Sequence, residues 1–199
     1  MIALRKLLIL AASVLLLAAC DSKPPQPKVS FANTDITGLD YTQHFQLTDH
    51  TGEARTMADY QGKVVLVFFG FAQCPDVCPT TLAEMVELKK QLGADGDKLQ
   101  VLFVTVDPER DTQEVLADFV PAFDPSFVAL RGNAEQTAQV AKDFKIFVQK
   151  VASKDGQSYT IDHTAGSYLF DPQGKLRLFV RHGRQEALLD DIRQLIAGA

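Results

Sequence analysis

Residues 64–79 have the sequence VVLVFFGFAQCPDVCP, and this stretch decides the fold. The run Val64–Phe69 is entirely apolar and rich in β-branched and aromatic residues, which is typical of a strand buried on both faces of a sheet. Gly70–Pro79 follows as a loop, and Thr80–Leu92 is predicted to be a helix because its apolar residues recur at helical intervals. A buried strand followed by a helix indicates one unit of an α/β sheet.

The chain on either side continues this pattern. Leu99–Val106 is predicted to be a second buried strand, and a helix is expected from Asp111, which would cap it because Glu114 stands three residues later. Upstream, Phe45–Thr48 and the turn Asp49–Gly52 predict a hairpin. Downstream we predict a strand over 127–130, a helix over 134–144, a hairpin of 147–151 with 159–161, a second hairpin of 167–170 with 175–180, and a closing helix over 185–196. The sequence therefore predicts an α/β fold with a mixed β-sheet flanked by helices.

The start of the chain predicts export. Arg5 and Lys6 precede an apolar run, Leu7–Ala19, that is too short for a stable membrane span but typical of a signal peptide. The run ends in Leu-Ala-Ala directly before Cys20, which resembles a bacterial lipobox. We therefore expect residues 1–19 to be removed and Cys20 to carry a lipid anchor.

The next segment predicts a tether. Residues 20–30 contain three prolines and almost no apolar side chains, so they are expected to be extended and to form no core. Asp21 resembles the signal that keeps a bacterial lipoprotein on the inner membrane. Residues 31–199 are then expected to form a single domain, lipid-anchored on the periplasmic side of that membrane.

The charge of the chain argues against one class of partner. The net charge is −5, and it becomes −7 when Arg5 and Lys6 are removed with the signal peptide. Because no cluster of Lys and Arg offers a footprint for phosphates, we expect no nucleic-acid partner. No coiled-coil pattern or exposed apolar helix is predicted, so we expect a monomer.

The cysteines give the sharpest chemical signal. Setting Cys20 aside leaves Cys74 and Cys78, a single close pair that is either a redox couple or half of a metal site. Pro79 suits the first position of a helix, which places Cys78 at or just before the helix start. Free N–H groups there favour a thiolate, so we expect a lowered pKa for one or both thiols. Thiolates select copper(I) or zinc over hard cations, and the spacing alone goes no further.

At this point the sequence resembles the Sco/SenC family of copper chaperones. The resemblance lies in Phe69-Gly70-Phe71 with Cys74-Pro75-Asp76-Val77-Cys78-Pro79, in Val106-Asp107-Pro108-Glu109-Arg110-Asp111-Thr112, and in Asp162-His163-Thr164 ahead of Tyr168-Leu169-Phe170-Asp171. These separated blocks cover the region from about residue 35 to residue 197. Gln73 is a departure, since many members carry histidine there.

The resemblance implies a thioredoxin-like fold with an extra N-terminal hairpin and a β-hairpin insertion. It implies a copper site, for Cu(I) and also Cu(II), made of Cys74, Cys78 and His163. The implied role is to deliver copper to the binuclear copper centre of cytochrome c oxidase, or to keep the cysteines of that centre reduced. The implied partners are the oxidase subunit that holds this centre and other copper chaperones. Asp107 and Asp162 are candidate neighbours of the site, although each could instead serve a turn.

Two other functions stay open on the residues alone. The pair Cys74 and Cys78 could act in thiol–disulfide exchange, although its gap is wider than the two residues of thioredoxins. A peroxidase is disfavoured. In the peroxidase family that this chain resembles, a threonine usually precedes the reactive cysteine, whereas Phe71-Ala72-Gln73 precede Cys74 here. The remaining histidines carry no spacing signal and are expected on the surface or in loops: His44, His50 and His182.

Overall fold

The computed structural model describes residues 30–39, 41, 45–154, 156, 158–183 and 185–199. The chain divides into two units, Met1–Ser30 and Phe31–Ala199, and the fold belongs to the second. The predicted signal peptide, Cys20, almost all of the tether and His44 lie outside the described residues. Within the described residues, the helices are too short or too polar to cross a membrane.

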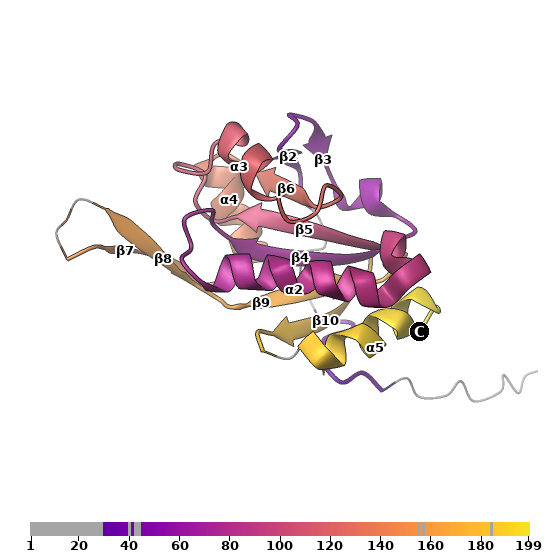
Figure 1. Cartoon of the computed structure of the whole chain (residues 1–199). Helices are drawn as coiled ribbons and strands as arrows, with labels where there is room; N and C mark the ends of the chain where they lie inside the picture. The colour runs from indigo at the N-terminus through magenta and orange to yellow at the C-terminus, as the bar shows by residue number, and fades with distance from the viewer. Residues whose placement is uncertain (1–29, 40, 42–44, 155, 157, 184) are drawn as a thin grey trace, which may run out of the picture. The chain divides into compact units, whose positions relative to one another are not determined.

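The main body is one mixed sheet with the strand order β1-β10-β9-β4-β5-β6-β2-β3 (Figure 1). Three neighbouring strands are parallel: β4 (Val64–Gly70), β5 (Leu99–Thr105) and β6 (Val128–Arg131). The other strands pair antiparallel: β1 (Thr34–Asp35), β10 (Leu176–Arg181), β9 (Gly166–Phe170), β2 (Leu47–Asp49) and β3 (Ala54–Arg55). This arrangement confirms the predicted mixed α/β sheet.

The central strand β4 is buried on both faces, as its apolar run predicted. Val65, Val67 and Phe69 belong to one core cluster, and Leu66 and Phe68 belong to the other. The second cluster lies under α2 (Val77–Leu92), α3 (Gln113–Phe119) and α5 (Gln185–Ile196). The first lies under α4 (Ala134–Asp143) and the 3₁₀ turn η1 (Met57–Tyr60), while a second 3₁₀ turn, η2 (Gly93–Lys98), links α2 to β5. Figure 1 shows α2 crossing one face of β4.

Two helix starts differ from the sequence prediction. Helix α2 begins at Val77, three residues earlier than expected, so its first turn contains Cys78 and Pro79. The first four N–H groups of a helix have no acceptor within the helix, so a proline in this turn costs no hydrogen bond. Helix α3 is capped by Thr112, whose Oγ1 accepts from Val115 N at 3.3 Å. The prediction that Asp111 caps this helix is therefore wrong.

A second, two-stranded sheet lies apart from the first. It consists of β7 (Val148–Ala152) and β8 (Tyr159–His163), and Figure 1 shows this hairpin projecting beyond the end of β9. Val148 pairs with His163, the last residue of β8. Since β4 and β5 are parallel and β9 is antiparallel to them, the loops after β4 and β5 and the segment before β9 meet at one edge of the sheet. The predicted site residues are on these segments.

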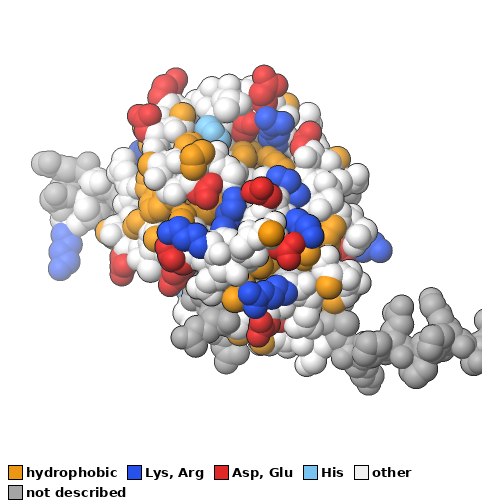
Figure 2. Space-filling view, turned by 45° about the vertical axis from the view of Figure 1, so that its right-hand side comes forward, with side chains coloured by type: hydrophobic (Ala, Val, Ile, Leu, Met, Phe, Trp, Pro, Cys, Tyr) orange, Lys and Arg blue, Asp and Glu red, His pale blue; other side chains and the backbone are white. Residues whose placement is uncertain are grey.

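The surface carries charges of both signs. On the face that Figure 2 shows, Lys and Arg side chains alternate with Asp and Glu side chains, and neither sign forms a continuous patch. Such a face offers no basic stripe for a phosphate backbone. The expectation that nucleic acid is not a partner stays a prediction.

Candidate metal site

The cysteine loop is built on a close contact between β4 and α2. A Cβ atom at Gly70 would lie 2.8 Å from Cys78 Sγ and 2.8 Å from a ring carbon of Phe103, so only glycine fits there without a shift. Within the loop, Cys74 N donates to the Phe71 carbonyl at 3.1 Å, which closes a turn. The glycine thus allows the helix cysteine to pack on the end of the central strand.

The two thiols differ in their exposure. Cys78 is fully buried in the core under α2, whereas Cys74 is half-buried and packs against both core clusters. Both cysteines are free. Burial, together with a hydrogen bond to Cys74, raises the pKa of the Cys78 thiol well above its usual range. The expected lowering is therefore wrong for Cys78, because loss of water disfavours the thiolate more than the helix start favours it.

His163 lies where β8 ends. Its Nδ1 is 3.1 Å from the carbonyl oxygen of Thr164, which can only accept a hydrogen bond, so Nδ1 carries the proton. Burial lowers the pKa of His163, against the opposing effects of that hydrogen bond and of the Asp162 charge. The ring meets Phe71 edge-on, with centroids 6.1 Å apart. A neutral imidazole in this tautomer keeps its Nε2 lone pair available for a metal ion.

One cavity joins the cysteine loop to the hairpin. It has a volume of about 250 Å³ and is lined by Phe71, Cys74, Pro75, Val77, Thr160, Ile161, Asp162, His163 and Ala165. Cys78 does not line it; its thiol is buried, four residues along the chain from Cys74. Among the described residues, no three His, Cys, Asp or Glu side chains are gathered closely enough to hold a metal ion. Two of the three predicted ligands, Cys74 and His163, therefore line one cavity, and Cys78 is outside its lining.

The two candidate neighbours occupy different positions. Asp107 is fully buried, forms an ion pair with Arg110 and accepts a hydrogen bond from Tyr159 Oη at 2.8 Å. It therefore contacts the hairpin that carries His163. Asp162 lines the cavity but its side chain is largely exposed, and the imidazole bonds the Thr164 carbonyl instead.

Asp111 supports the cysteine loop, a role that the sequence prediction missed. It is fully buried, and its carboxylate accepts from Ala72 N at 3.0 Å and from Thr105 Oγ1 at 2.6 Å. Burial raises the pKa of Asp111, while these two hydrogen bonds act in the opposite direction. The backbone two residues before Cys74 is thereby tied to the end of β5. An acidic residue soon after a buried strand was the available signal.

His182 lies in the turn after β10, which agrees with the prediction of a surface or loop residue, but its side chain packs against α2. It is half-buried, its Nδ1 lies 3.0 Å from Thr81 Oγ1 of α2, and its ring meets Phe68 with centroids 5.6 Å apart. Its Nε2 is buried without a hydrogen-bond partner in the part of the chain that the structure describes. Burial, and then the nearby His163, lowers the pKa of His182. Nothing in the local sequence signalled this packing.

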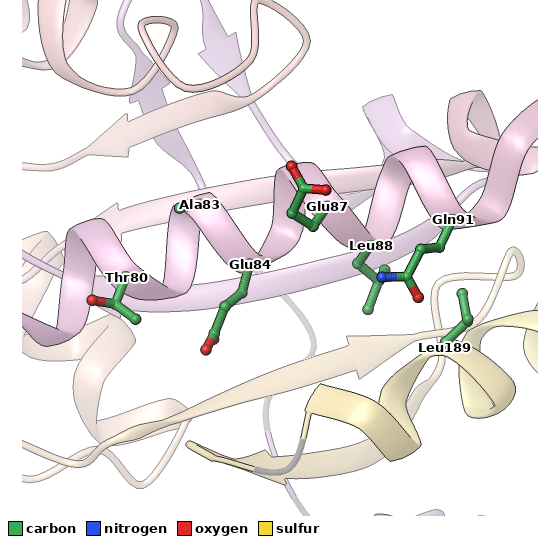
Figure 3. A pocket seen from close by; sticks show the side chains of 7 residues that line it. All are labelled: Thr80, Ala83, Glu84, Glu87, Leu88, Gln91 and Leu189. Carbon is green, nitrogen blue, oxygen red and sulfur yellow. The ribbon is translucent and has the colours of Figure 1, made fainter.

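A larger cavity, of about 470 Å³, lies away from the thiols. Figure 3 shows its lining along the outer side of α2 and at α5: Thr80, Ala83, Glu84, Glu87, Leu88, Gln91 and Leu189. It contains no thiol or imidazole. Its size alone gives it no chemistry, so the smaller cavity beside Cys74 is the candidate site.

The fold and this site together define a class of protein. A central parallel strand that leads into a helix, with one thiol in the loop between them and a second in the first helical turn, is the arrangement of a thioredoxin-like dithiol protein. A half-buried imidazole on a neighbouring hairpin adds a third donor, and two thiols with one imidazole suit a soft or borderline metal ion.

Comparison with known sequences identifies the family. The profile described as SCO1/SenC matches residues 33–197, so the chain belongs to the SCO1/SenC family. The mitochondrial SCO2 homolog of Bos taurus is 38% identical over 156 residues, which cover 77% of this chain and 59% of that protein. The chain thus spans about three fifths of the length of this curated relative.

Solved structures give the same result. Bradyrhizobium japonicum ScoI, solved with copper bound, has a TM-score of 0.69 and 40% identity, and the match covers 76% of this chain and 97% of that one. A SCO1/SenC family lipoprotein from Bacillus anthracis has a TM-score of 0.68 and 27% identity, covering 83% of this chain and 99% of that one. The expected thioredoxin-like fold of this family is therefore confirmed.

Proposed function

We propose that this chain is a membrane-anchored copper chaperone, which delivers copper to the binuclear copper centre of cytochrome c oxidase or keeps the cysteines of that centre reduced. The observation that carries the proposal is the cavity at the end of β4, which Cys74 and His163 line together, with the buried thiol of Cys78 four residues along the chain from Cys74. Membership of the SCO1/SenC family and a copper-bound relative support copper as the metal.

The donor set fits this cargo. Two thiolates and one imidazole suit copper(I) and are too few for a closed structural zinc site. The raised pKa of Cys78 does not oppose binding, because the metal ion displaces the thiol proton. The neutral imidazole of His163 also suits copper(II), so the site would hold both oxidation states. Since the ligands are not gathered in the described residues, binding draws the hairpin and the cysteine loop together.

The second candidate is thiol–disulfide exchange, favoured by two free thiols that are only four residues apart. Cys74 and Cys78 would be oxidised to a disulfide while a partner's disulfide is reduced to two thiols. The buried Cys78 is a poor first nucleophile, so the half-buried Cys74 would attack. This chemistry suits reduction of one docked partner better than general reduction, and it is compatible with copper delivery.

The proposed location rests on the start of the chain. We propose that Cys20 is lipidated after removal of residues 1–19, that residues 20–30 form a tether, and that the domain works on the periplasmic side of the inner membrane. The lipoprotein among the relatives supports this proposal. Cys20→Ser should move the protein from the membrane fraction to the soluble fraction, and mass spectrometry of the mature N-terminus should lose the lipid mass. An unmodified Cys20 in the wild-type protein would contradict it.

The decisive experiment is a copper(I) titration of the reduced full-length protein in detergent, without oxygen and against a competing chelator. We expect a single tight equivalent. His163→Ala should lower the copper(I) affinity by more than about 100-fold, because mutating a residue that only hydrogen-bonds a metal ligand already lowers metal affinity by up to about 100-fold. Cys78→Ser should remove tight binding, because a single thiolate is left.

The matched control is His50→Ala, which removes a histidine in the β2–β3 turn, far from the thiols in the sheet order. It should leave copper affinity unchanged. Tight binding that is indifferent to His163 would mean a two-thiolate site, and the proposed ligand set would be wrong. The absence of tight binding in the wild-type protein would overturn the chaperone proposal and leave the two thiols as a redox couple.

A further inference from the structure

The hairpin that carries His163 is held by side chains. Among the described strands, β7 and β8 pair only with each other. The segment Asp107–Arg110, which follows β5, makes several polar contacts with this hairpin. Tyr159 Oη donates to Asp107 Oδ1 at 2.8 Å, and Lys150 forms an ion pair with Glu109 at 2.7 Å. The place of His163 relative to the cysteine loop therefore depends on this segment.

Arg110 is the residue of this segment that contacts both sides of the site. Its Nη1 donates to the Tyr159 carbonyl at 2.7 Å and to Gln73 Oε1 at 3.1 Å. Its guanidinium lies over the Tyr159 ring, 3.7 Å from the centroid, and 5.8 Å from the centroid of Phe71. A single nitrogen atom of Arg110 thus donates hydrogen bonds to both the cysteine loop and strand β8.

The groups that Arg110 contacts are close to the proposed ligands. Gln73 directly precedes Cys74. Tyr159 and His163 lie on the same face of β8, because they are four residues apart and side chains alternate along a strand. The Phe71 ring packs against the imidazole. Holding these groups limits the separation between the first thiol and the histidine.

The burial of Arg110 does not suggest a role in stability alone. Its side chain is 18% exposed and its partner Asp107 is 0% exposed. Its Nη2 is buried and has no hydrogen-bond partner in the described residues. Buried ion pairs with unmet N–H groups bring little net stability, and they persist where a fixed geometry is needed.

We propose that Arg110 is a positioning residue of the metal site, which sets the distance between His163 and Cys74 by joining Gln73 to Tyr159. The identity of the metal rests on the proposed function. Gln73, which stands where many family members carry histidine, is then the acceptor for this arginine in the present chain. Copper(II) binding should depend on Arg110 more than copper(I) binding, because copper(II) prefers nitrogen donors in a fixed geometry, whereas the two thiolates contribute most to copper(I) binding.

The test is Arg110→Lys, compared with Arg177→Lys. Lysine keeps the positive charge but loses the second bond of the planar guanidinium and its stacking. Arg177 is a close match: it is 16% exposed, pairs with the buried Asp171 at 3.2 Å and lies over the Phe31 ring at 5.4 Å. It is in β10 near Leu176, which pairs with Phe170 and lies toward the edge where β4 begins. The two substitutions therefore disturb similar contacts at opposite edges of the sheet.

Three quantities are measured: the copper(II) affinity, the visible thiolate-to-copper(II) charge-transfer absorption, and the nitrogen hyperfine splitting in the electron paramagnetic resonance spectrum of bound copper(II). For Arg110→Lys we expect copper(II) affinity to fall about 10- to 100-fold, with loss or change of the imidazole splitting. Copper(I) affinity should fall by a smaller factor than copper(II) affinity. Gln73→Ala, which truncates an exposed side chain, should act in the same direction and tests the proposal if the arginine variant folds poorly. Arg177→Lys should lower stability without changing the spectra.

Two results would overturn the proposal. One is that Arg110→Lys and Gln73→Ala both have the same spectra, the same copper(I) affinity and the same copper(II) affinity as the wild-type protein. The other is an equal loss in Arg177→Lys, which would show general destabilisation. A wild-type protein that binds no copper would overturn the proposed function and this inference together. Hydrogen exchange of the metal-free protein tests whether Arg110 holds the hairpin independently of any metal. Arg110→Lys should speed exchange in β7–β8, and Arg177→Lys should not.

Discussion

The two hairpins β2–β3 and β7–β8 are attached to the molecule in different ways. Strand β2 joins the main sheet through its pairing with β6, where Thr48 faces Arg131 and Asp49 faces Leu130. The hairpin β7–β8 forms a sheet of its own. Its contacts with the body include the buried Ile161, the hydrogen bond from Tyr159 to Asp107, and the residues around Arg110.

The difference separates stability from function in this fold. A hairpin in a continuous ladder is fixed by backbone hydrogen bonds and cannot shift without breaking them. A hairpin held by side chains can shift through rotamer changes at a smaller cost. The candidate ligand His163 lies on the second kind, where the ligands have to draw together. We therefore expect substitutions in β2–β3 to change the free energy of unfolding, and substitutions in β7–β8 to change local opening and metal binding.

Among substitutions that test the two hairpins, the largest effect on the free energy of unfolding is expected for Asp49→Ala. The Asp49 side chain is 2% exposed; it accepts from Thr51 N at 2.8 Å and Glu53 N at 3.0 Å, and it pairs with Arg55 at 2.7 Å. Removing it leaves these donors unmet, which should lower the free energy of unfolding by about 2–3 kcal/mol. Urea denaturation measures the loss, and copper affinity should not change. A loss below about 1 kcal/mol would mean that the ladder alone holds this hairpin.

Acid should weaken the same hairpin. Burial by itself would raise the pKa of Asp49, but hydrogen bonds from Thr51 and Arg55 outweigh it and lower the pKa from 3.8 to about 2. The unfolded chain therefore binds the proton first, so this carboxylate stabilises the fold fully above about pH 4 and loses its contribution, about 2 kcal/mol, as the pH falls toward 2. The unfolding free energies of wild type and Asp49→Asn, measured against pH, should converge in acid. A constant difference between them would contradict the assignment.

A smaller effect is expected for Tyr159→Phe. This change removes the hydrogen bond to Asp107 but keeps the ring under Arg110, so the free energy of unfolding should fall by about 1 kcal/mol. Hydrogen exchange in β7–β8 should accelerate more than elsewhere. Tyr168→Phe is the control, because Tyr168 Oη donates to the Phe144 carbonyl at 2.7 Å in the core. Equal exchange profiles for the two variants would show that the tyrosine does not hold the hairpin.

The smallest effect is expected for Phe147→Ser. Phe147 is 58% exposed, at the base of β7, and the substitution should change the free energy of unfolding by no more than about 0.5 kcal/mol. Phe144, at 0% exposure, is the contrast, and Phe144→Ser should cost several kcal/mol. Thermal unfolding of both variants checks the pair. A large loss from Phe147→Ser would mean that the outer face of the hairpin is covered.

Local patterns in the sequence were sufficient for most of the elements. The apolar runs at Val64 and Leu99 predicted the two central strands, because burial on both faces leaves no place for polar residues. The helix over 185–196 has the predicted bounds. The close spacing of Cys74 and Cys78 placed both thiols at the junction between β4 and α2. These features depend on neighbours in the chain, so the sequence by itself determined them.

Tertiary structure alone decided the environment of the site. The thiol of Cys78 has a raised pKa because the strand β4 and the helix α2 exclude water from it, and nothing near it in sequence indicates this. Asp111 turns inward to the cysteine loop instead of capping a helix, and His182 packs against α2. Arg110 joins Gln73 to Tyr159 across 37 and 49 residues of chain. Such contacts depend on which segments the sheet order brings together, and periodicity and spacing carry no information about segments so far apart.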